Sequence, residues 1–342
     1  MRALVITEYG GPEVLKVEER PDAPQPGPGE VRVAVKAAGI NFADLMARVG
    51  LYEDAPKAPC VVGYEFAGTV ESVGEGVTDY TPGQRVLGGS RFGGYAELVT
   101  TPETALVPLA DDWSYEEGAA FPVHYATAYA GIVRYGSLGA GERVLLHAAA
   151  GGVGIAATQI ARLVGAGEIY GTASGSKHEA IRGFGVDHPI DYTRQDFRKE
   201  VRRISGEKQP LDLVMDAIGG SSFRKSWSLL GAGGRLVCFG ASSVMSGDKR
   251  DLRTVARMLA TTPIFHPMPM MSSSRAVIGL NMLRLWDAKG SLDEYVQPLR
   301  AWVDEGKLRP VVSEAFPLER GPDAHRFMGE RRNIGKVVLQ MS

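Results

Sequence analysis

The stretch Arg143–Gly154, with the sequence R-V-L-L-H-A-A-A-G-G-V-G, decides the fold. It opens with the apolar run Val144–Leu146, which is typical of a strand buried on both faces. No side chain from Ala148 to the end of the stretch is larger than valine, and Ile155–Val164 follows with apolar residues at helical spacing. A strand, a glycine turn and a helix in this order let backbone N–H groups approach a pyrophosphate, toward which the helix N-terminus directs roughly half a positive charge. The stretch therefore predicts a dinucleotide site formed by Ala150, Gly151, Gly152, Val153 and Gly154.

The chain beyond this turn alternates short apolar runs with helical patterns. The expected strands are Glu168–Ser174, Asp187–Tyr192, Leu211–Ile218 and Arg235–Gly240, and the expected helices are Ser176–Phe184, Asp196–Ile204 and Ser222–Leu230. Strands joined by helices of about ten residues imply right-handed crossovers and a doubly wound parallel sheet, the α/β architecture of a Rossmann domain. The turn has A-A-A-G-G-V-G in place of the usual G-x-G-x-x-G, so the alternation carries more of the prediction than the turn does.

Length and composition predict an ordinary globular protein of about two domains. The chain has 342 residues, of which 44% are hydrophobic and 23% are charged. A net charge of −2 gives no general electrostatic argument for a nucleic acid or an anionic membrane. The first residues lead directly into the strand Ala3–Thr7 without a signal-like segment, and no apolar run approaches the roughly 20 residues of a membrane span. We expect a cytosolic protein that binds no nucleic acid.

The first hundred residues have a different character, because short strand-like runs alternate with turns rich in Gly and Pro. The runs are Val31–Ala37, Ala67–Val73, Arg85–Leu87 and Tyr95–Val99. They predict a partly closed β domain, and the next segment, Trp113–Tyr135, is expected to be helical.

The last part of the chain is expected to contain an irregular segment, two strands and a helix. Leu252–Met271 is rich in Met and Pro and is expected to be irregular. Ala276–Leu280, Leu292–Glu305 and Gly335–Gln340 are expected to form a strand, a helix and a strand, the last of which can rejoin the N-terminal β domain. The predicted domains are therefore a β-rich domain of residues 1–122 and 270–342 and a dinucleotide-binding domain of residues 123–269.

A set of motifs carries a resemblance that spans nearly the whole chain. They are G-I-N-F-A-D (Gly39–Asp44), R-V-G-L-Y (Arg48–Tyr52), G-Y-E-F-A-G (Gly63–Gly68), H-A-A-A-G-G-V-G (His147–Gly154) and N-I-G-K-V-V-L (Asn333–Leu339). With them the chain resembles the medium-chain dehydrogenase/reductase superfamily, and within it the zinc-independent quinone oxidoreductase branch of zeta-crystallin-like enzymes and vesicle amine transport protein 1 relatives. The resemblance implies a Rossmann domain together with a discontinuous, β-rich, GroES-like catalytic domain.

The same resemblance bears on metal content. Zinc-dependent members have a cysteine where this chain has Asn41 and a histidine where it has Tyr64. Cys60 and Cys238 lie in apolar runs and are expected to be small buried residues, and the six histidines show no paired spacing. We expect no metal site. A metal-free site suits acceptors that conjugation already polarises, such as quinones and α,β-unsaturated carbonyls.

The end of the strand Glu168–Ser174 favours NADPH as the cofactor. An NAD site normally has Asp or Glu here, about 20 residues past the glycine turn, to hold the ribose 2′-OH. In this chain Ser174 stands 23 residues after Gly151 and Lys177 follows, so a hydroxyl and an ammonium replace the carboxylate and suit a 2′-phosphate. Lys177 is alternatively a solvated lysine in the first turn of a helix.

Residues farther along bear on the same choice of cofactor. Asp187 and Asp191 come too late in the sequence to be the ribose carboxylate. The resemblance places Tyr192 beside the 2′-phosphate and adenine, although a tyrosine at the end of a strand is alternatively a core aromatic.

The resemblance also implies which residues lie near the nicotinamide or close over the cofactor. They are Asn41, Thr127, Phe239, Gly240, Ala241 and Asn333. The amide of Asn41 can donate to a substrate carbonyl without titrating. Alternatively, Asn41 and Asp44 cap a short helix, Leu45–Val49; we prefer the site for Asn41 and the cap for Asp44. Quinone reductases of this branch commonly have a tyrosine where this chain has Met46, so the predicted pocket lacks one polar group.

Tyr64 and His124 are the catalytic candidates that compensate for this loss. One of them is expected to donate a proton or a hydrogen bond to the acceptor. The alternatives are a packed aromatic for Tyr64 and a surface or capping histidine for His124. Protonation by solvent is a further possibility.

Two segments remain open. Pro263–Met271 is either a lid over an apolar substrate or a connector packed in the core. Ala276–Leu280 resembles the edge strand through which relatives pair two sheets, so a homodimer is expected. The leading function is an NADPH-dependent reductase of a small apolar quinone or conjugated carbonyl. The competing function is a nucleotide-binding protein of the vesicle amine transport type, with a lipid or membrane role and little catalysis.

Overall fold

A six-stranded parallel sheet organises one of the two units into which the chain folds. The computed structural model describes residues 1–245 and 251–341. The described residues of the first unit, the parallel-sheet unit, are 127–245 and 251–281. Those of the second, the β unit, are 1–126 and 282–341. The domain limits 1–122, 123–269 and 270–342 stay a prediction.

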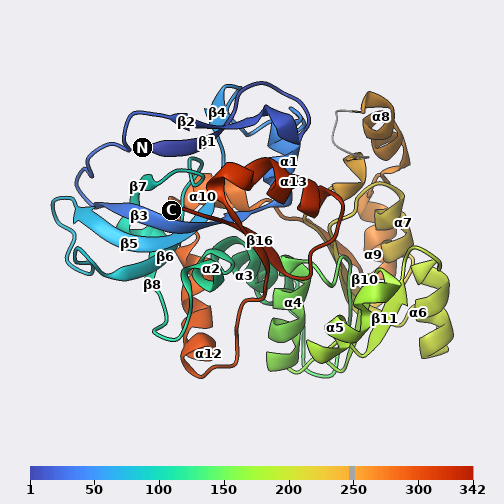
Figure 1. The fold of residues 1–342 in the computed structure, drawn as a ribbon. Coiled ribbons are helices and arrows are strands. Elements are labelled where there is room, and N and C mark those ends of the chain that lie inside the picture. Colours follow the sequence, from blue (N-terminus) through green and yellow to red (C-terminus); the bar gives the residue numbers. More distant parts are fainter. Residues whose placement is uncertain (246–250, 342) are drawn as a thin grey trace. The chain divides into compact units, whose positions relative to one another are not determined.

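The parallel-sheet unit, whose strands β10 and β11 are labelled in Figure 1, has the strand order expected of a doubly wound fold. Its strands are β9 (Arg143–Leu146), β10 (Glu168–Ala173), β11 (His188–Asp191), β12 (Leu211–Asp216), β13 (Leu230–Cys238) and β14 (Ala276–Gly279). They are ordered β11-β10-β9-β12-β13-β14, and all neighbours run parallel. The chain moves outward from β9 to β11 and then returns to the other side of β9. The predicted α/β sheet is confirmed, and its order reverses between β9 and β12.

The connecting helices begin and end where the sequence provides caps. They are α4 (Gly152–Leu163), α5 (His178–Gly183), α6 (Phe197–Ser205) and α7 (Ser221–Trp227), with the helical turns η3 (Ala130–Arg134), η4 (Gly175–Lys177) and η5 (Ser242–Val244). Helix α6 illustrates the rule. The carboxylate of Asp196 accepts from the backbone N–H of Arg198 at 2.9 Å, and Gly206 ends the helix with a φ of 72°.

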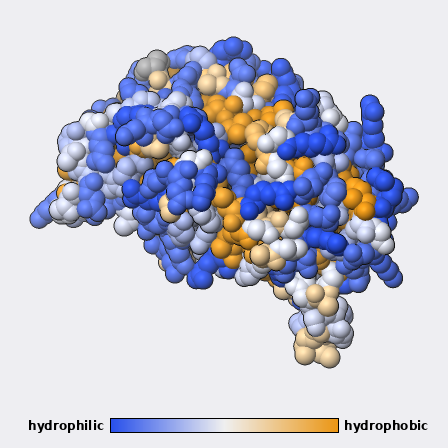
Figure 2. Space-filling view, turned by 90° about the horizontal axis from the view of Figure 1, so that it is seen from below, coloured by the Kyte–Doolittle hydropathy of each residue, from blue (hydrophilic) through white to orange (hydrophobic). Residues whose placement is uncertain are grey.

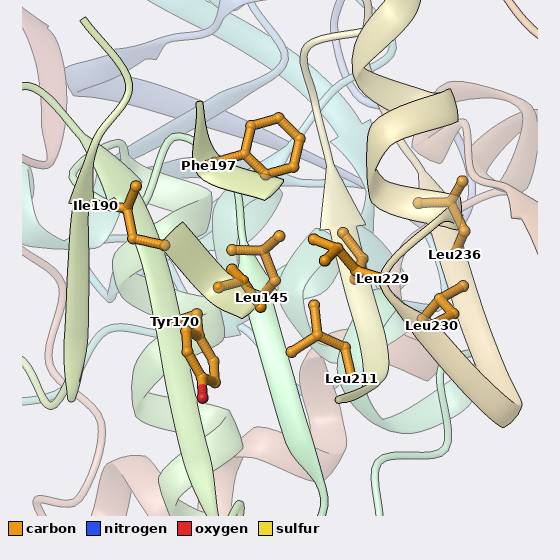
Figure 3. Close-up of a cluster of buried hydrophobic side chains, with 10 residues drawn as sticks. Leu145, Tyr170, Ile190, Phe197, Leu211, Leu229, Leu230 and Leu236 are labelled. Atoms are coloured by element: carbon orange, nitrogen blue, oxygen red, sulfur yellow. The ribbon is translucent and has the colours of Figure 1, made fainter. Parts of the chain in front are cut away.

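The hydrophobic core of this unit packs on one face of the sheet (Figure 3). Leu145 of β9 and Tyr170 of β10 lie against Phe197 of α6 and against Leu229, which follows α7. Side chains alternate along a strand, so Val144 faces the opposite side, where it is also fully buried. The prediction that β9 is buried on both faces is confirmed, which holds the strand rigidly below the turn that follows it.

The prediction that Leu252–Met271 is irregular is wrong. The segment contains helices α8 (Leu252–Thr261) and α9 (Pro267–Ser273). Asp251 caps α8 by accepting from the N–H of Arg253 at 3.0 Å. Pro267 occupies the start of α9, where a missing N–H costs no helical hydrogen bond, so its presence is compatible with a helix.

The β unit is built mostly from antiparallel strands, although its last two strands run parallel to each other. They are β1 (Arg2–Ile6), β2 (Leu15–Glu19), β3 (Glu30–Ile40), β4 (Cys60–Val61), β5 (Glu65–Val73), β6 (Arg85–Gly89), β7 (Leu98–Pro102), β8 (Leu106–Pro108), β15 (Val312–Pro317) and β16 (Lys336–Gln340). One sheet has the order β15-β16-β3-β5-β6-β8, with β7 also paired to β3, and a second has the order β2-β1-β4. Strand β16 runs antiparallel to β3, which confirms that the last predicted strand rejoins the N-terminal β structure.

The helices of the β unit are short. They are α1 (Phe42–Arg48), α2 (Tyr115–Ala119), α3 (Pro122–Tyr129), α10 (Met282–Lys289), α11 (Asp293–Val296), α12 (Arg300–Asp304) and α13 (Gly321–Gly329), with the turns η1 (Pro12–Val14), η2 (Glu103–Ala105), η6 (Gln297–Leu299) and η7 (Leu318–Arg320). The last residues of α3 count with the parallel-sheet unit. The expected helix Leu292–Glu305 is broken into three pieces at Pro298, which lies in η6 and removes one backbone donor.

Among residues 1–245 and 251–341, none of the helices combines the length and the apolar character that crossing a bilayer requires.

Candidate functional site

The glycine turn lies where β9 passes into α4, at the point where the order of the parallel sheet reverses. Gly151 precedes the helix with extended backbone angles, and the first N–H groups of α4 have no acceptor within the helix. Gly154 is buried, and a Cβ on it would lie 2.5 Å from the Ala148 carbonyl oxygen. Open parallel sheets bind ligands at the carboxyl ends of their strands beside such a reversal. This turn therefore fits the pyrophosphate of a dinucleotide.

A chain of buried hydrogen bonds fixes the strand end below this turn. His147 Nδ1 lies 3.1 Å from Thr172 Oγ1, and His147 Nε2 lies 3.0 Å from Ser226 Oγ. Ser226 donates its hydroxyl hydrogen to Asp216 at 2.9 Å. The Ser226 oxygen is therefore an acceptor for His147 Nε2–H, and Nδ1 accepts from Thr172. Burial lowers the pKa of His147 against the charge of Asp216, which agrees with an uncharged ring in this chain.

Asp216 joins this chain to two further loops at the same edge of the sheet. Its carboxylate accepts from the Ile218 N–H at 2.8 Å, and its carbonyl oxygen accepts from the Phe239 N–H at 3.1 Å. A Cβ on Gly219 would lie 3.2 Å from Ala241 Cα, so the loops after β12 and β13 are in contact. The structure thus brings the predicted residues Phe239, Gly240 and Ala241 to the edge that carries the glycine turn.

The loop after β10 carries the residues predicted to choose the cofactor. Ser174 follows the last residue of β10 and is partly exposed, and Lys177 ends η4. Tyr192, after β11, is 41% exposed, so it is not the core aromatic that was the alternative. The parallel register sets Asp191 opposite Ala173, and its carboxylate lies 2.8 Å from where a Cβ on Gly175 would be. Asp191 therefore lies next to this loop in space, although it comes late in the sequence.

A second set of polar side chains forms a buried cluster in the β unit. It joins Asn41 before α1, Glu65 of β5, His124 of α3 and Lys336 of β16, which are all at most 7% exposed. The Lys336 ammonium donates to Asn41 Oδ1 at 2.8 Å and to Glu65 Oε1, and His124 Nε2 lies 3.0 Å from it. Asn41 Nδ2 donates to Glu65 Oε1 at 2.9 Å.

The cluster determines the charge state of His124 and occupies part of the hydrogen-bonding capacity of Asn41. Burial, and secondly the charge of Lys336, hold the pKa of His124 well below its usual range. His124 is therefore neither a surface nor a charged histidine. An amide carries two hydrogens, and the bond to Glu65 uses one of them. A hydrogen bond from Asn41 to a substrate carbonyl stays a prediction.

Asp44 lies beside this cluster and holds the start of α1. Helix α1 begins at Phe42, three residues before the expected start, and Asp44 occupies its first turn. The Asp44 carboxyl group accepts from the Asn41 N–H and from the Tyr95 hydroxyl, each at 2.7 Å. Burial raises the pKa of Asp44 to about 7 despite these donors. The preference for a capping role of Asp44 agrees with these contacts.

Tyr64 contributes an aromatic wall in the same unit. Its ring centroid lies 5.2 Å from that of Phe92 and 6.5 Å from that of Tyr52. Its hydroxyl is buried, and the Tyr52 side chain is the polar group that influences its pKa through a hydrogen bond. Tyr64 also lines a small recess together with Leu87 and Trp286. Burial raises the pKa of Tyr64, so the hydroxyl keeps its proton.

Other predicted residues have more local surroundings. Thr127 of α3 is 6% exposed. Asn333 donates from Nδ2 to the Gly335 carbonyl oxygen at 2.8 Å. Within the described ranges, no group of three or more His, Cys, Asp or Glu residues is placed to hold a metal ion. Glu65 and Lys336 are the site residues that the sequence analysis missed, although both lie in motifs that it quoted.

Comparison with known proteins identifies the family. Residues 27–111 match the family described as alcohol dehydrogenase GroES-like domain, and residues 184–339 match the family described as zinc-binding dehydrogenase. The synaptic vesicle membrane protein VAT-1 homolog of Homo sapiens is 40% identical over 340 residues, which cover 99% of this chain and 86% of the relative. The chain belongs to the medium-chain dehydrogenase/reductase superfamily.

Solved structures of this superfamily resemble the whole chain. Escherichia coli quinone oxidoreductase complexed with NADPH is 29% identical with a TM-score of 0.85, and the match covers 99% of this chain and 100% of that one. CurK enoyl reductase is 28% identical with a TM-score of 0.85, and the match covers 100% and 99%. The chain is thus an oxidoreductase of the superfamily. One of these similar structures contains a nicotinamide cofactor, and the glycine turn of this chain fits a cofactor of that class.

Replacing Gly154 by alanine tests the cofactor turn. The added methyl group would lie 2.5 Å from a backbone oxygen and 2.6 Å from Ala149 Cα, so the turn must move. We expect the Kd for NADPH, measured by quenching of protein fluorescence, to rise roughly tenfold or more. Gly183→Ala is the matched control, because a Cβ there meets no atom within 4 Å. Equal Kd values for the two variants would contradict the assignment of the turn.

Asp44 predicts a pH dependence of stability. A buried carboxyl group whose pKa is about 7 when folded and near 3.8 when unfolded binds more protons in the folded chain between these values. Its contribution is therefore fully present below the unfolded pKa and is lost as the pH rises toward 7, with an upper limit of about 4 kcal/mol. We expect the unfolding free energy of the wild type, relative to Asp44→Asn, to fall between acidic and neutral pH in urea titrations. A pH-independent difference between the two proteins would contradict the prediction.

Proposed function

We propose that this chain is an NADPH-dependent, zinc-independent reductase of a small apolar quinone or α,β-unsaturated carbonyl compound. One observation carries the proposal: the β unit offers hydrogen-bond donors that stay uncharged near neutral pH, namely the Tyr64 hydroxyl and the His124 ring. The ammonium group of Lys336 donates to acceptor atoms of His124, Asn41 and Glu65. Lys336 is therefore the cation of the cluster, and the His124 ring stays uncharged.

Uncharged donors suit an acceptor that conjugation has already activated. The bound cofactor supplies a hydride. A hydrogen bond from Tyr64 or His124 stabilises the oxygen on which negative charge develops, and no strong acid is needed because an enolate or quinol oxygen takes its proton readily.

The choice of NADPH is supported by the loop after β10. Ser174 and Lys177 provide a hydroxyl and an ammonium where an NAD site has a carboxylate. Asp191 disfavours a 2′-phosphate, because its negative carboxylate lies beside Gly175 in the same loop. Hydrogen bonds from Thr193 lower the pKa of Asp191, and the guanidinium of Arg194 lies 3.9 Å from its carboxylate, so a cation accompanies that carboxylate.

We further propose a homodimer through β14. The strand lies at the end of the parallel sheet and pairs with β13 on one side. An edge strand with apolar residues such as Val277 and Ile278 promotes pairing with another chain. Light scattering measures the oligomeric state.

A second candidate function rests on exposed apolar side chains of α8, α9 and the segment between them. Leu252, Leu259, Ile264, Met268 and Met271 are between 61% and 95% exposed. Apolar patches also interrupt the hydrophilic surface in Figure 2. Relatives named synaptic vesicle membrane proteins make a lipid surface the alternative ligand. Co-sedimentation with liposomes in the absence of NADPH oxidation would favour this function.

Exchanging charges in the loop after β10 tests the choice of cofactor. We expect Ser174→Asp to weaken NADPH binding by roughly a hundredfold, because a carboxylate repels the 2′-phosphate. Asp191→Asn is expected to strengthen NADPH binding severalfold. NADH, which lacks the phosphate, serves as the internal control, and its Kd should change little with Asp191→Asn. A wild type that binds NADH more tightly than NADPH would overturn the proposal.

A panel of quinones and enones, assayed by NADPH oxidation, tests the reaction itself. We expect turnover of at least one class, with kcat/KM lowered roughly tenfold or more by Tyr64→Phe or by His124→Gln. Tyr9→Phe, at a tyrosine that is 51% exposed, is the matched control. If Tyr64→Phe and His124→Gln both keep the wild-type kcat/KM for an enone, neither is the donor and solvent protonates the product. No turnover of any acceptor would reject the enzyme.

A further inference from the structure

One lysine organises the polar cluster of the β unit. Lys336 is 1% exposed, and its ammonium group contacts Asn41 Oδ1 at 2.8 Å, His124 Nε2 at 3.0 Å and Glu65 Oε1. An ammonium group has three N–H donors and no acceptor. Each of its hydrogens therefore has one acceptor in this cluster.

The charge state of the cluster follows from the partners of Glu65. Its Oε1 accepts from Asn41 Nδ2 and from Lys336, and its Oε2 accepts from the Val123 N–H at 2.7 Å. A carboxyl group whose partners all donate is ionised, and its charge favours the ammonium form of Lys336. Burial lowers the pKa of Lys336, and the charges of Glu65 and then Asp44 offset only part of this shift. The pair is thus a carboxylate and an ammonium.

We propose that Lys336 is a positioning residue that fixes the His124 ring in a single uncharged tautomer, with its proton on Nδ1. An ammonium group only donates, so His124 Nε2 must present its lone pair to Lys336. A neutral imidazole has one N–H, which then belongs to Nδ1. A proton on Nε2 would remove this hydrogen bond and, in a charged ring, bring two cations to 3.0 Å. His124 is thereby a permanent donor at Nδ1.

The same ammonium orients Asn41, and the ion pair packs closely against the backbone at Gly39. The amide oxygen of Asn41 faces Lys336 and the amide nitrogen faces Glu65, so a flipped amide would lose both bonds. A Cβ on Gly39 would lie 2.6 Å from Lys336 Cε and 2.8 Å from Glu65 Cγ. Glycine at position 39 therefore leaves just the room that the ion pair occupies.

The use of this tautomer rests on the proposed function, in which His124 donates to the acceptor. The tautomer itself depends on the cluster alone, and nitrogen-15 NMR of histidine-labelled protein reports it without any substrate. His124→Gln assigns the signal of His124. We expect the wild type to show the Nδ1–H form from about pH 6 to about pH 9, without titration.

Removing the ammonium tests the dependence on Lys336. In Lys336→Met the cluster keeps a carboxylate but loses its cation, so we expect His124 to take up a proton and to titrate within the same pH range. Lys336→Arg should restore the uncharged ring, because a guanidinium also only donates. The matched control is Lys307→Met, which removes an exposed ammonium that contacts Glu305 and should leave the His124 signal unchanged.

Two results would overturn the proposal. One is an Nε2–H or charged His124 ring in the wild type at neutral pH. The other is a His124 signal that Lys336→Met does not change. If Lys336→Met fails to fold, the variant Lys336→Met/Glu65→Gln removes both charges, and we expect it to show a mixture of the two tautomers. A pure Nδ1–H form in that double variant would likewise reject the role of Lys336.

Steady-state kinetics of the variants distinguish the control of the tautomer by Lys336 from the donor role of His124. In Lys336→Met we expect kcat to fall roughly tenfold with a smaller change in KM, and kcat/KM to gain an inflection at the pKa of His124 measured by NMR. If the wild type shows the Nδ1–H form but His124→Gln keeps full kcat/KM, the donor role of His124 is wrong, whereas control of the tautomer by Lys336 stands.

Discussion

The buried ion pair between Glu65 and Lys336 is the interaction on which the β unit depends. Two charges removed from water are costly, and breaking such a pair costs about 3–5 kcal/mol because it leaves one charge uncompensated. The pair holds β16 against β5 on either side of β3, and Asn41 and His124 add α1 and α3 to it. Elements from both ends of the chain thus converge on one ammonium group. The cluster is rigid for the same reason, which suits side chains that must orient an acceptor.

Much of the parallel-sheet unit could be predicted from sequence, because its signals are local. Apolar runs alternating with helical patterns gave the six strands in the right succession, and small residues after Leu146 gave the turn. Helices α8 and α9 were not predicted in this way, since the Met and Pro residues suggested an irregular segment. Their caps, Asp251 and Pro267, are local signals that were available in the sequence.

The side-chain network of the site was less predictable, because it depends on pairing across long distances. Nothing near Glu65 announces Lys336, which is 271 residues away along the chain. The available signal was a charged residue at the start of each of two strands, Glu65 in β5 and Lys336 in β16, because a charge that is buried there demands a partner of opposite sign. Asp191 shows the same limit. It comes late in sequence, and only the register of β10 with β11 brings it to the loop that carries Ser174.

The pairing of β16 with β3 has a consequence for the order in which the protein is made. All strands of the parallel sheet, up to Gly279, leave the ribosome before Lys336 is synthesised, whereas β3 and β5 leave long before it. The parallel-sheet unit can therefore fold during translation. The β unit, by contrast, is completed only after β16 has emerged, because Glu65 lacks the counter-charge of Lys336 until then.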